Sequence, residues 1–449
     1  MNTELIRKYN VPTPRYTSYP TVPHWDESTF KPENYLADIA RSSATDKGIS
    51  LYIHLPYCES LCTYCGCNKR ITKNHAVELP YIDAVLREWK MYADLMGGKP
   101  KISELHLGGG TPTFFKPESL KKLIDGIREQ GEFTPNADLS FEAHPNNTSE
   151  KHLATLRLLG FKRLSLGIQD FDPVVQLTIN RIQPFGRVRQ VCEAAQKANY
   201  HSINMDLIYG LPKQKLESVI NTVKKVLVLK PDRIALYSYA HVPWKSPSQR
   251  GYDESDLPTD EQKLNLFITA RNMFTEAGYI SIGMDHFALP HDDLAIAQTK
   301  GELHRNFMGY TPQKTDIMIG LGVSSIGDNT HSMGQNEKNV EAYLERIVSG
   351  QFPIIKGHSL TKEDKEIREA ITKLMCQYHF ENGPLNNREY LKIVTDRLAE
   401  PIADGLLEIT ESGIRVNKKG TPFIRNICMA LDQRYWASNP KGNMFSSSI

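Results

Sequence analysis

Short apolar runs alternate with longer amphipathic stretches along the chain from about residue 50 onward. The short runs suit strands, whereas the longer stretches repeat their apolar positions with the period of a helix. The predicted strands cover residues 50–54, 102–107, 137–142, 163–168, 202–206 and 233–237. The predicted helices cover residues 80–96, 117–130, 149–159, 187–198 and 214–229. Strand and helix in regular alternation are typical of a parallel sheet covered by helices.

Six strand–helix repeats predict an α/β fold, a partial (β/α)6 barrel of the TIM type. A doubly wound open sheet is the alternative, because periodicity does not reveal whether a sheet closes. The segment PTPRYTSYP at residues 12–20 has too many prolines for a helix and too many aromatic residues for disorder. We therefore expect residues 1–48 to form an ordered extension that covers the site. Residues 49–357 are expected to form the barrel with accessory strands.

The pattern becomes mostly helical after about residue 358. Helices are predicted at residues 361–379 and 387–404, a hairpin around residues 411–413 and a last helix at 422–436. This order predicts a smaller, winged-helix-like C-terminal domain at residues 358–449. Winged helices often bind DNA, but here a packing or substrate-covering role is favoured because the chain is close to neutral.

Charge and composition restrict the functional classes further. The chain has 54 Lys and Arg against 52 Asp and Glu, a formal charge of +2, so nucleic acid and anionic membranes are poor expectations as partners. There is no apolar run long enough to span a membrane, and the first residues lack the pattern of a secretory signal. We therefore expect a cytoplasmic protein without a membrane span.

Four of the seven cysteines lie within ten positions, at Cys58, Cys62, Cys65 and Cys67, directly after the first predicted strand. In structural zinc sites, two pairs of ligands are separated by a longer stretch of chain than the one that separates these cysteines. Three thiolates spaced C-x3-C-x2-C can instead hold three irons of a [4Fe–4S] cluster and leave the fourth iron open for chemistry. Cys67 is either a fourth ligand, which would give a closed electron-transfer centre, or a nearby thiol with another role.

Polar or glycine-rich segments follow the other predicted strands. Residues 108–111 follow the second strand, Glu142 ends the third, Gln169 follows the fourth and Asp206 ends the fifth. In β/α barrels the active site is built at this end of the strands. The GGGTP segment lacks the lysine and the spacing of a phosphate-binding loop, so its glycines favour close contact between a ligand and the backbone.

The cysteine spacing after the first strand of a β/α repeat resembles the radical S-adenosylmethionine superfamily. The surrounding YIHLP and CGC segments resemble its oxygen-independent coproporphyrinogen III oxidase (dehydrogenase) branch. The resemblance extends over most of the chain. It includes LIRKYNVPTPRYTSYP at 5–20, LHLGGGTPT at 105–113, SLGIQDFDPVVQLTINRIQ at 165–183, DLIYGLPKQ at 206–214, and residues 237–250 and 304–327.

The resemblance implies one [4Fe–4S] cluster held by Cys58, Cys62 and Cys65, and two molecules of S-adenosylmethionine. Tyr52, which is also carried over as a catalytic residue, Gly109, Glu142 and Ile326 match contacts to the first molecule. Tyr64, Gly110, Thr111, Gln169, Arg181, Asp206 and Ala240 match contacts to the second. One departure lies beside Glu142: many members have Asp-Pro-Arg where this chain has His144-Pro145-Asn146.

The resemblance also implies the reaction. A 5′-deoxyadenosyl radical from S-adenosylmethionine takes hydrogen from two propionate side chains of coproporphyrinogen III, which lose carbon dioxide and become the vinyl groups of protoporphyrinogen IX in haem biosynthesis. Because four propionates make the substrate polyanionic, we expect a local basic lining. The candidates are Arg15, Lys245, Arg250 and Arg305.

A haem-binding chaperone is the main alternative, because a related branch keeps the three-cysteine motif. That branch typically lacks the PRYTSYP extension and the cysteine corresponding to Cys67, and this chain has both. A radical methyltransferase that modifies haem and an iron–sulfur electron carrier are further alternatives. For the oxidase we expect a tetrapyrrole substrate, an electron donor and an electron acceptor of unknown identity, and a monomer.

Overall fold

The computed structural model describes residues 3–42, 48–244, 246–381, 387–410 and 413–438. Contacts group the chain into two compact units. The first unit combines Met1–Asp26, Gly278–Lys314 and Leu360–Ile449, and the second combines Glu27–Ala277 and Thr315–Ser359. These units join segments that are distant in sequence, whereas the expected domains 1–48, 49–357 and 358–449 are consecutive. That division into functional domains stays a prediction.

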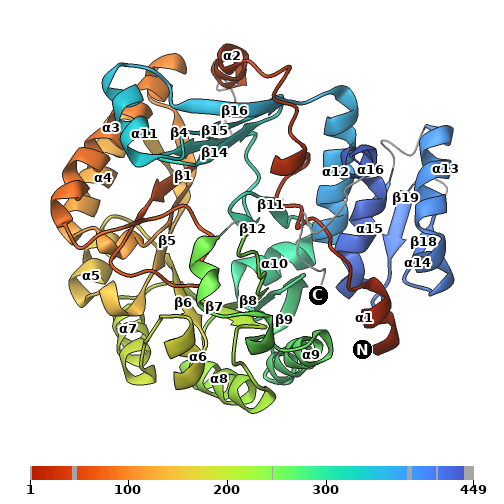
Figure 1. Cartoon of the computed structure of the whole chain (residues 1–449). Helices are drawn as coiled ribbons and strands as arrows, with labels where there is room; N and C mark the ends of the chain where they lie inside the picture. The colour runs from red at the N-terminus through yellow and green to blue at the C-terminus, as the bar shows by residue number, and fades with distance from the viewer. Residues whose placement is uncertain (1–2, 43–47, 245, 382–386, 411–412, 439–449) are drawn as a thin grey trace. The chain divides into compact units, whose positions relative to one another are not determined.

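The centre of the second unit is a run of parallel strands in chain order (Figure 1). They are β1 (Ile49–Leu55), β4 (Lys101–Gly109), β5 (Glu132–Ala143), β6 (Arg163–Gln169), β7 (Ser202–Tyr209) and β8 (Arg233–Ser238). Each strand pairs in parallel with the next. A doubly wound sheet reverses its strand order at a switch point, so this uninterrupted order favours the partial barrel over the open-sheet alternative. All the predicted strands are confirmed.

Four accessory strands continue the same sheet beyond β1. The strand β13 (Ile317–Leu321) pairs with β1 in parallel. The strands β14 (Ile326–Asn329), β15 (Ser332–Asn336) and β16 (Ile354–Ser359) follow as an antiparallel series. Parallel strands need a long crossover, which the chain supplies before β13, whereas short turns are enough for the antiparallel strands.

The predicted helices are also present, within two residues of their expected bounds. They are α3 (Glu78–Leu95), α4 (Pro117–Gln130), α5 (Glu150–Leu158), α7 (Phe185–Lys197) and α8 (Leu216–Leu229). In α4 the buried residues include Leu120, Leu123, Ile124 and Ile127, which repeat on one face of the helix. The helices therefore form because one apolar stripe of each is buried.

The second unit holds further helices, short strands and 3₁₀ turns. They are α2 (Pro32–Ser42), β2 (Tyr57–Cys58), β3 (Arg70–Ile71), α6 (Pro173–Thr178), α9 (Asp260–Glu276), α11 (Val340–Val348) and 3₁₀ turns at His75–Val77, Pro112–Phe114, Pro145–Asn147, Pro247–Gly251 and Glu254–Asp256. Within the described part of the chain, no helix is both long enough and apolar enough to cross a membrane.

The first unit is mostly helical. Its elements are α1 (Thr3–Tyr9), a 3₁₀ turn (Val22–His24), β9 (Ile280–Gly283), β10 (His286–Ala288), α10 (Asp293–Lys300), β11 (His304–Asn306), β12 (Gly309–Thr311), α12 (Lys362–Gln377), β17 (His379–Glu381), α13 (Arg388–Arg397), α14 (Ala399–Ala403), β18 (Leu407–Ile409), β19 (Gly413–Val416), a 3₁₀ turn (Thr421–Phe423), α15 (Ile424–Leu431) and α16 (Gln433–Ala437). Its small sheet has the order β17-β19-β18. The strands β18 and β19 pair in antiparallel fashion, as the two arms of the predicted hairpin would, and the turn residues 411–412 lie outside the described residues.

Two predicted C-terminal helices are each divided in the structure. The helix expected at 387–404 breaks at Leu398, because Pro401 lacks an amide hydrogen and its ring clashes with the carbonyl one turn earlier. The helix expected at 422–436 breaks at Asp432. There the carboxylate accepts a hydrogen bond from the Tyr435 amide at 2.8 Å and starts α16.

The proline-rich segment at 12–20 is ordered, as predicted, and is fixed to the C-terminal helices of the same unit. The Arg425 guanidinium donates to the carbonyl of Pro14 at 3.1 Å. The Tyr16 hydroxyl donates to the Asp432 carboxylate at 3.0 Å. Both donors, Arg425 and Tyr16, are buried. The segment is therefore part of the core of this unit.

A buried carboxylate on α3 leads to a pH-dependent prediction. Glu88 accepts hydrogen bonds from the Gly322 amide at 2.8 Å, the Asn336 side chain at 2.6 Å and the Tyr343 hydroxyl at 2.7 Å. Burial raises the Glu88 pKa from 4.5 to about 7. Because the folded state holds this proton more tightly than the unfolded state, the stabilisation is complete below pH 4.5 and is lost as pH rises through about 7.

We expect Glu88→Gln to lower the thermal midpoint most at pH 5 and less at pH 8. Between pH 5 and pH 8 the wild type loses a stabilisation on the order of 3 kcal/mol, whereas Glu88→Gln has no carboxylate at this position and keeps its stability. Thermal unfolding followed by circular dichroism at both pH values measures it. The exposed Glu129→Gln on α4 is the control. A constant difference between Glu88→Gln and the wild type across this range would contradict the assignment.

Candidate active site

A cysteine-containing loop follows β1 and is closed at its base by a short parallel pairing. The strand β2 pairs with β3, which brings Tyr57 beside Arg70 and Cys58 beside Ile71. The Thr72 amide also donates to the Cys58 carbonyl at 2.9 Å. Because the backbone leaves and returns at the same place, the cysteines are held together instead of spreading along an extended chain.

The outer part of this loop is fastened to the segment that includes α6. The Thr63 amide donates to the Ile179 carbonyl at 3.0 Å. The Asn180 side chain donates to the Leu61 carbonyl at 2.8 Å. The loop is therefore anchored at both ends, and its position depends on the element that follows β6.

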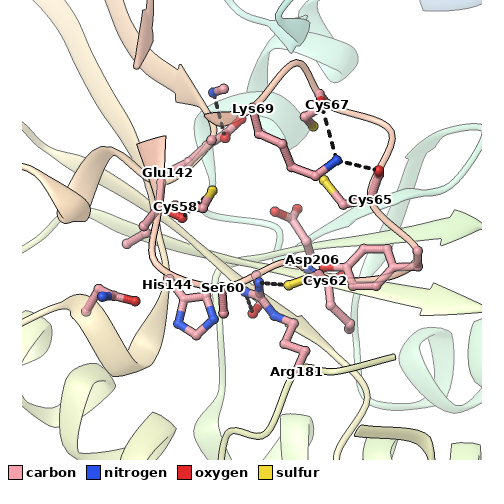
Figure 2. A pocket seen from close by; sticks show the side chains of 18 of the residues that line it. Cys58, Ser60, Cys62, Cys65, Cys67, Lys69, Glu142, His144, Arg181 and Asp206 are labelled. Atoms are coloured by element: carbon pink, nitrogen blue, oxygen red, sulfur yellow. Dashed lines mark hydrogen bonds between the residues drawn. The ribbon is translucent and has the colours of Figure 1, made fainter. Parts of the chain in front are cut away.

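All four clustered cysteines line one cavity of about 280 Å³ (Figure 2). Cys62 is buried, Cys58 and Cys65 are half-buried and Cys67 is exposed. The Cys58 sulfur lies 3.3 Å from the hydroxyl oxygen of Thr111, at the end of the glycine segment. The thiols therefore face the same space as the strand-end residues.

The thiols differ in how readily they ionise. The Cys65 pKa is lowered to about 6, first by a hydrogen bond from Cys67 and then by the Lys69 ammonium, against the opposing effect of burial. The Cys67 pKa is raised, because the pair carries one negative charge and Cys65 holds it. Burial raises the Cys58 pKa to about 11, so a positive partner is required to hold Cys58 as a thiolate.

The donor set fits an iron–sulfur cluster better than a single ion. Within the described residues, no three His, Cys, Asp or Glu side chains converge on a point that would hold one metal ion. In a cube-shaped cluster each thiolate binds a different iron, so the ligand sulfurs lie well apart. Three cysteines that line one cavity could each supply one thiolate to such a cluster.

Two carboxylates and an amide lie at or near the carboxyl ends of neighbouring strands. Gln169 ends β6 and Glu142 is the last residue but one of β5, whereas Asp206, which was expected to end its strand, lies three residues before the end of β7. Glu142 accepts a hydrogen bond from the Gly109 amide at 3.2 Å. Asp206 accepts from the Ser165 hydroxyl at 2.9 Å and from the Asn204 side chain at 2.8 Å. Burial, with a smaller effect from Glu142, raises the Asp206 pKa to about 6. The cavity thus carries half-buried negative charge that a cationic ligand would offset.

The glycine segment after β4 is required by close packing. A Cβ atom at Gly110 would lie 2.5 Å from the Pro56 carbonyl oxygen, and Gly109 has a φ of +110°. A larger side chain is excluded at Gly110 by contact, and at Gly109 also by the backbone conformation. The backbone of this segment therefore passes directly beside the start of the cysteine loop.

Arg181 is the main positive group of the cavity. Its guanidinium donates to the Gly167 carbonyl at 2.6 Å and lies 3.5 Å from the Cys62 sulfur. Its Nε atom is buried and has no hydrogen-bond partner among the residues that the structure describes. Because an unsatisfied buried donor is costly, this atom indicates that a ligand with an acceptor group belongs here.

Comparison with known proteins identifies the family. The Radical SAM superfamily profile matches residues 52–226. Oxygen-independent coproporphyrinogen III oxidases of Synechocystis and Escherichia coli K12 are each 39% identical to this chain over 99% of its length, which covers 97% and 98% of their own lengths. The solved structure of the Escherichia coli coproporphyrinogen III oxidase, a radical SAM enzyme, matches with a TM-score of 0.90 and 37% identity, and covers 96% of this chain and 98% of that one.

The chain belongs to the oxygen-independent coproporphyrinogen III oxidases. Membership confirms the expected α/β architecture, the enzyme class and the radical SAM chemistry, and it implies a [4Fe–4S] cluster and S-adenosylmethionine. The cysteines and the unpartnered Arg181 atom fit these groups.

The cavity brings together most of the site residues expected from the family resemblance. They are Cys58, Cys62, Tyr64, Cys65, Gly109, Gly110, Thr111, Glu142, Gln169, Arg181 and Asp206. Tyr52 lies on β1 beside Glu142, and its ring stacks on His106 with a centroid distance of 6.1 Å. The Ala240 carbonyl accepts from Gln249 at 3.2 Å, and Ile326 begins β14.

The expected basic residues lie in different settings. In the first unit, Arg15 forms an ion pair with Asp285 at 2.5 Å. Arg305 is buried in the same unit, with its guanidinium 4.4 Å from the Tyr310 ring centre. Arg250, in the second unit, is exposed, and Lys245 falls outside the described residues.

The sequence patterns missed several cavity residues. Lys69 donates to the Cys65 carbonyl at 2.9 Å, and its place directly after the cysteines was a usable signal. Tyr237 lies near the end of β8, so extending the strand-end argument by one strand would have found it. His144 was noted only as a departure from the family pattern, and nothing in its spacing indicated that it lines the cavity.

A buried network behind Gln169 leads to a prediction about the site's rigidity. Gln169 has a φ of +64°, and the next residue, Asp170, is fully buried. The Asp170 carboxylate accepts from the Thr222 hydroxyl at 2.8 Å, the Gln214 side chain at 2.5 Å and the Asp172 amide at 2.7 Å. The network fixes the backbone that carries Gln169 in an otherwise unfavourable conformation.

We expect Asp170→Asn to lower the free energy of unfolding by about 1–3 kcal/mol, because a buried amide N–H₂ would face hydrogen-bond donors. Urea unfolding measures the change. Asp172→Asn is the matched control, because asparagine caps α6 as well as aspartate does and should have an effect below about 0.5 kcal/mol. Equal stabilities for Asp170→Asn and the wild type would remove this role from the network.

Proposed function

We propose that this chain carries out the oxygen-independent oxidative decarboxylation of two propionate side chains of coproporphyrinogen III to vinyl groups, which gives protoporphyrinogen IX in haem biosynthesis. One observation carries the proposal. The C-x3-C-x2-C thiols line the same cavity as Glu142, Gln169 and Asp206, in a chain 39% identical over nearly its whole length to enzymes named for this activity.

Cys58, Cys62 and Cys65 are the proposed cluster ligands. Cys67 stays outside the set because it is exposed, because the motif requires three thiolates, and because its hydrogen bond to Cys65 favours ionisation of the neighbour. When bound, the cluster and S-adenosylmethionine supply one-electron cleavage of the nucleotide and hydrogen abstraction from a propionate. Lys69 and Arg181 offset the negative charge of the thiolates.

Two molecules of S-adenosylmethionine are proposed. Tyr52, Gly109, Glu142 and Ile326 would bind the first, with Tyr52 also acting in catalysis. Tyr64, Gly110, Thr111, Gln169, Arg181, Asp206 and Ala240 would bind the second. The chemistry supports this division, since Glu142 and Asp206 are acceptors for ammonium and ribose hydroxyl groups, whereas the free Nε–H of Arg181 suits a carboxylate.

The tetrapyrrole substrate requires cationic groups for its propionates. Arg305 is the strongest candidate, because its Nη1 atom is buried without a hydrogen-bond partner among the described residues. Arg15 would need to release Asp285, whose pKa it holds far below the ordinary value despite burial. Lys245 and Arg250 remain proposals, as does closure of residues 1–48 over the site. We further propose a cytoplasmic monomer that uses a separate electron donor and acceptor.

Anaerobic turnover tests the function. Cluster-reconstituted protein with S-adenosylmethionine, a low-potential reductant and coproporphyrinogen III should yield a tetrapyrrole that has lost two carboxyl groups, together with 5′-deoxyadenosine. Mass spectrometry of the oxidised products measures both. Cys62→Ser should form neither product. Deoxyadenosine formed beside an intact tetrapyrrole would keep the radical chemistry but refute the substrate, and haem would then be the ligand to test.

The second nucleotide site leads to a separate prediction. Under anaerobic equilibrium dialysis, the wild-type protein should bind two molecules of S-adenosylmethionine per chain. Asp206→Asn should retain one and bind the other at least tenfold more weakly, because an amide cannot balance a cation as a carboxylate does. The exposed Asp94→Asn on α3 is the control. Saturation of the wild type at one molecule would contradict the second site.

A further inference from the structure

His144 is held firmly at the end of β5, where it caps the 3₁₀ turn Pro145–Asn147. Its amide donates to the Thr113 hydroxyl at 3.3 Å. Its carbonyl accepts from the Asn147 amide at 3.0 Å and from the Thr148 hydroxyl at 2.8 Å. The backbone position of this residue is therefore fixed from both sides.

The imidazole has a defined tautomer. Its Nδ1 atom accepts a hydrogen bond from the Asn146 amide at 3.2 Å, so Nδ1 carries no proton. Burial and the nearby Arg181 charge lower the His144 pKa to about 2, and the ring is neutral at working pH. The single ring proton is therefore on Nε2.

The Nε2 proton is left without an acceptor among the residues that the structure describes. Nε2 makes no hydrogen bond to any residue in the described part of the chain, whereas the ring lines the cavity that holds Cys58, Cys62 and Arg181 (Figure 2). An aspartate at this position would also accept from the Asn146 amide, so capping alone does not require histidine. Histidine adds a neutral donor on the cavity side, where aspartate would add negative charge.

We propose that His144 donates its Nε2–H to a sulfur atom of the iron–sulfur cluster and thereby raises the cluster's reduction potential. The inference rests on the proposed cluster ligands Cys58, Cys62 and Cys65. Reduction adds negative charge to the cluster, and a hydrogen bond to sulfur stabilises the reduced form more than the oxidised form. Arg181 acts in the same direction through its contact with Cys62. His144 is thus a positioning and tuning residue rather than a cluster ligand.

Two amide substitutions separate the two functions of His144. Asn can accept from the Asn146 amide and keep the cap, but its side chain is too short to place a donor where Nε2 lies. Gln extends a side-chain N–H farther and can restore the donor. The reduction potential of each reconstituted protein is measured by titration with detection of the reduced cluster by electron paramagnetic resonance, at matched iron content.

We expect His144→Asn to lower the equilibrium constant for one-electron reduction about tenfold, equivalent to about 59 mV. His144→Asp should lower it further because it adds negative charge, and His144→Gln should recover part of the loss. The control is His379→Asn, an exposed position on β17. Its potential should equal that of the wild type.

Three results would overturn the inference. The first is an unchanged potential in His144→Asn at full iron content. The second is an unchanged potential with weaker binding of S-adenosylmethionine, which would give the donor to the nucleotide instead. The third is equal lowering in His144→Asn and His144→Gln, which would indicate a structural effect. Failure of the wild-type protein to assemble any cluster would instead refute the proposed function, so the two failures are distinguishable.

Discussion

The parallel register of the central strands is the constraint on which the site depends. It places Leu55 beside Gly109, Leu107 beside Phe141 and Gly167 beside Asp206. Because neighbouring strands end at one edge, residues far apart in sequence face a common cavity. A slip of one residue in any pair would turn the strand-end side chain to the opposite face and remove it from the cavity. The geometry of the site therefore depends on the same hydrogen bonds that form the sheet.

The cysteine loop resolves a conflict between burial and charge. Thiolates are the metal ligands, but burial at Cys58 opposes ionisation. Lys69 and Arg181 oppose this effect of burial, because they bring positive charge to the loop. The cluster's own positive irons would complete the balance. The β2–β3 pairing then keeps the thiols together before any cluster is present.

Local sequence patterns predicted much of this architecture. Strand periodicity found the six central strands from β1 to β8 but not β13, and the predicted position of Glu142 and Asp206 at strand ends indicated their convergence. The break at Leu398 was missed although Pro401 signals it, and the break at Asp432 was missed because a single capping carboxylate does not interrupt a helical pattern. The assignment of residues to two nucleotides came from family resemblance, since neither periodicity nor spacing encodes a ligand. His144 could not be placed in the cavity, because its direction is set by a backbone hydrogen bond in a turn.

The polar groups of the cavity differ in what they lack in the free protein. Asp206 is held by Ser165 and Asn204, yet its pKa still rises to about 6, so local hydrogen bonds do not fully replace water. Arg181 has the opposite deficit, with one N–H unsatisfied. A ligand with both a cationic group and a carboxylate meets both deficits at once, and S-adenosylmethionine has a sulfonium, an ammonium and a carboxylate. Asp206 and Arg181 would therefore be complementary to such a ligand, and its binding would recover the cost of burying them in the free protein.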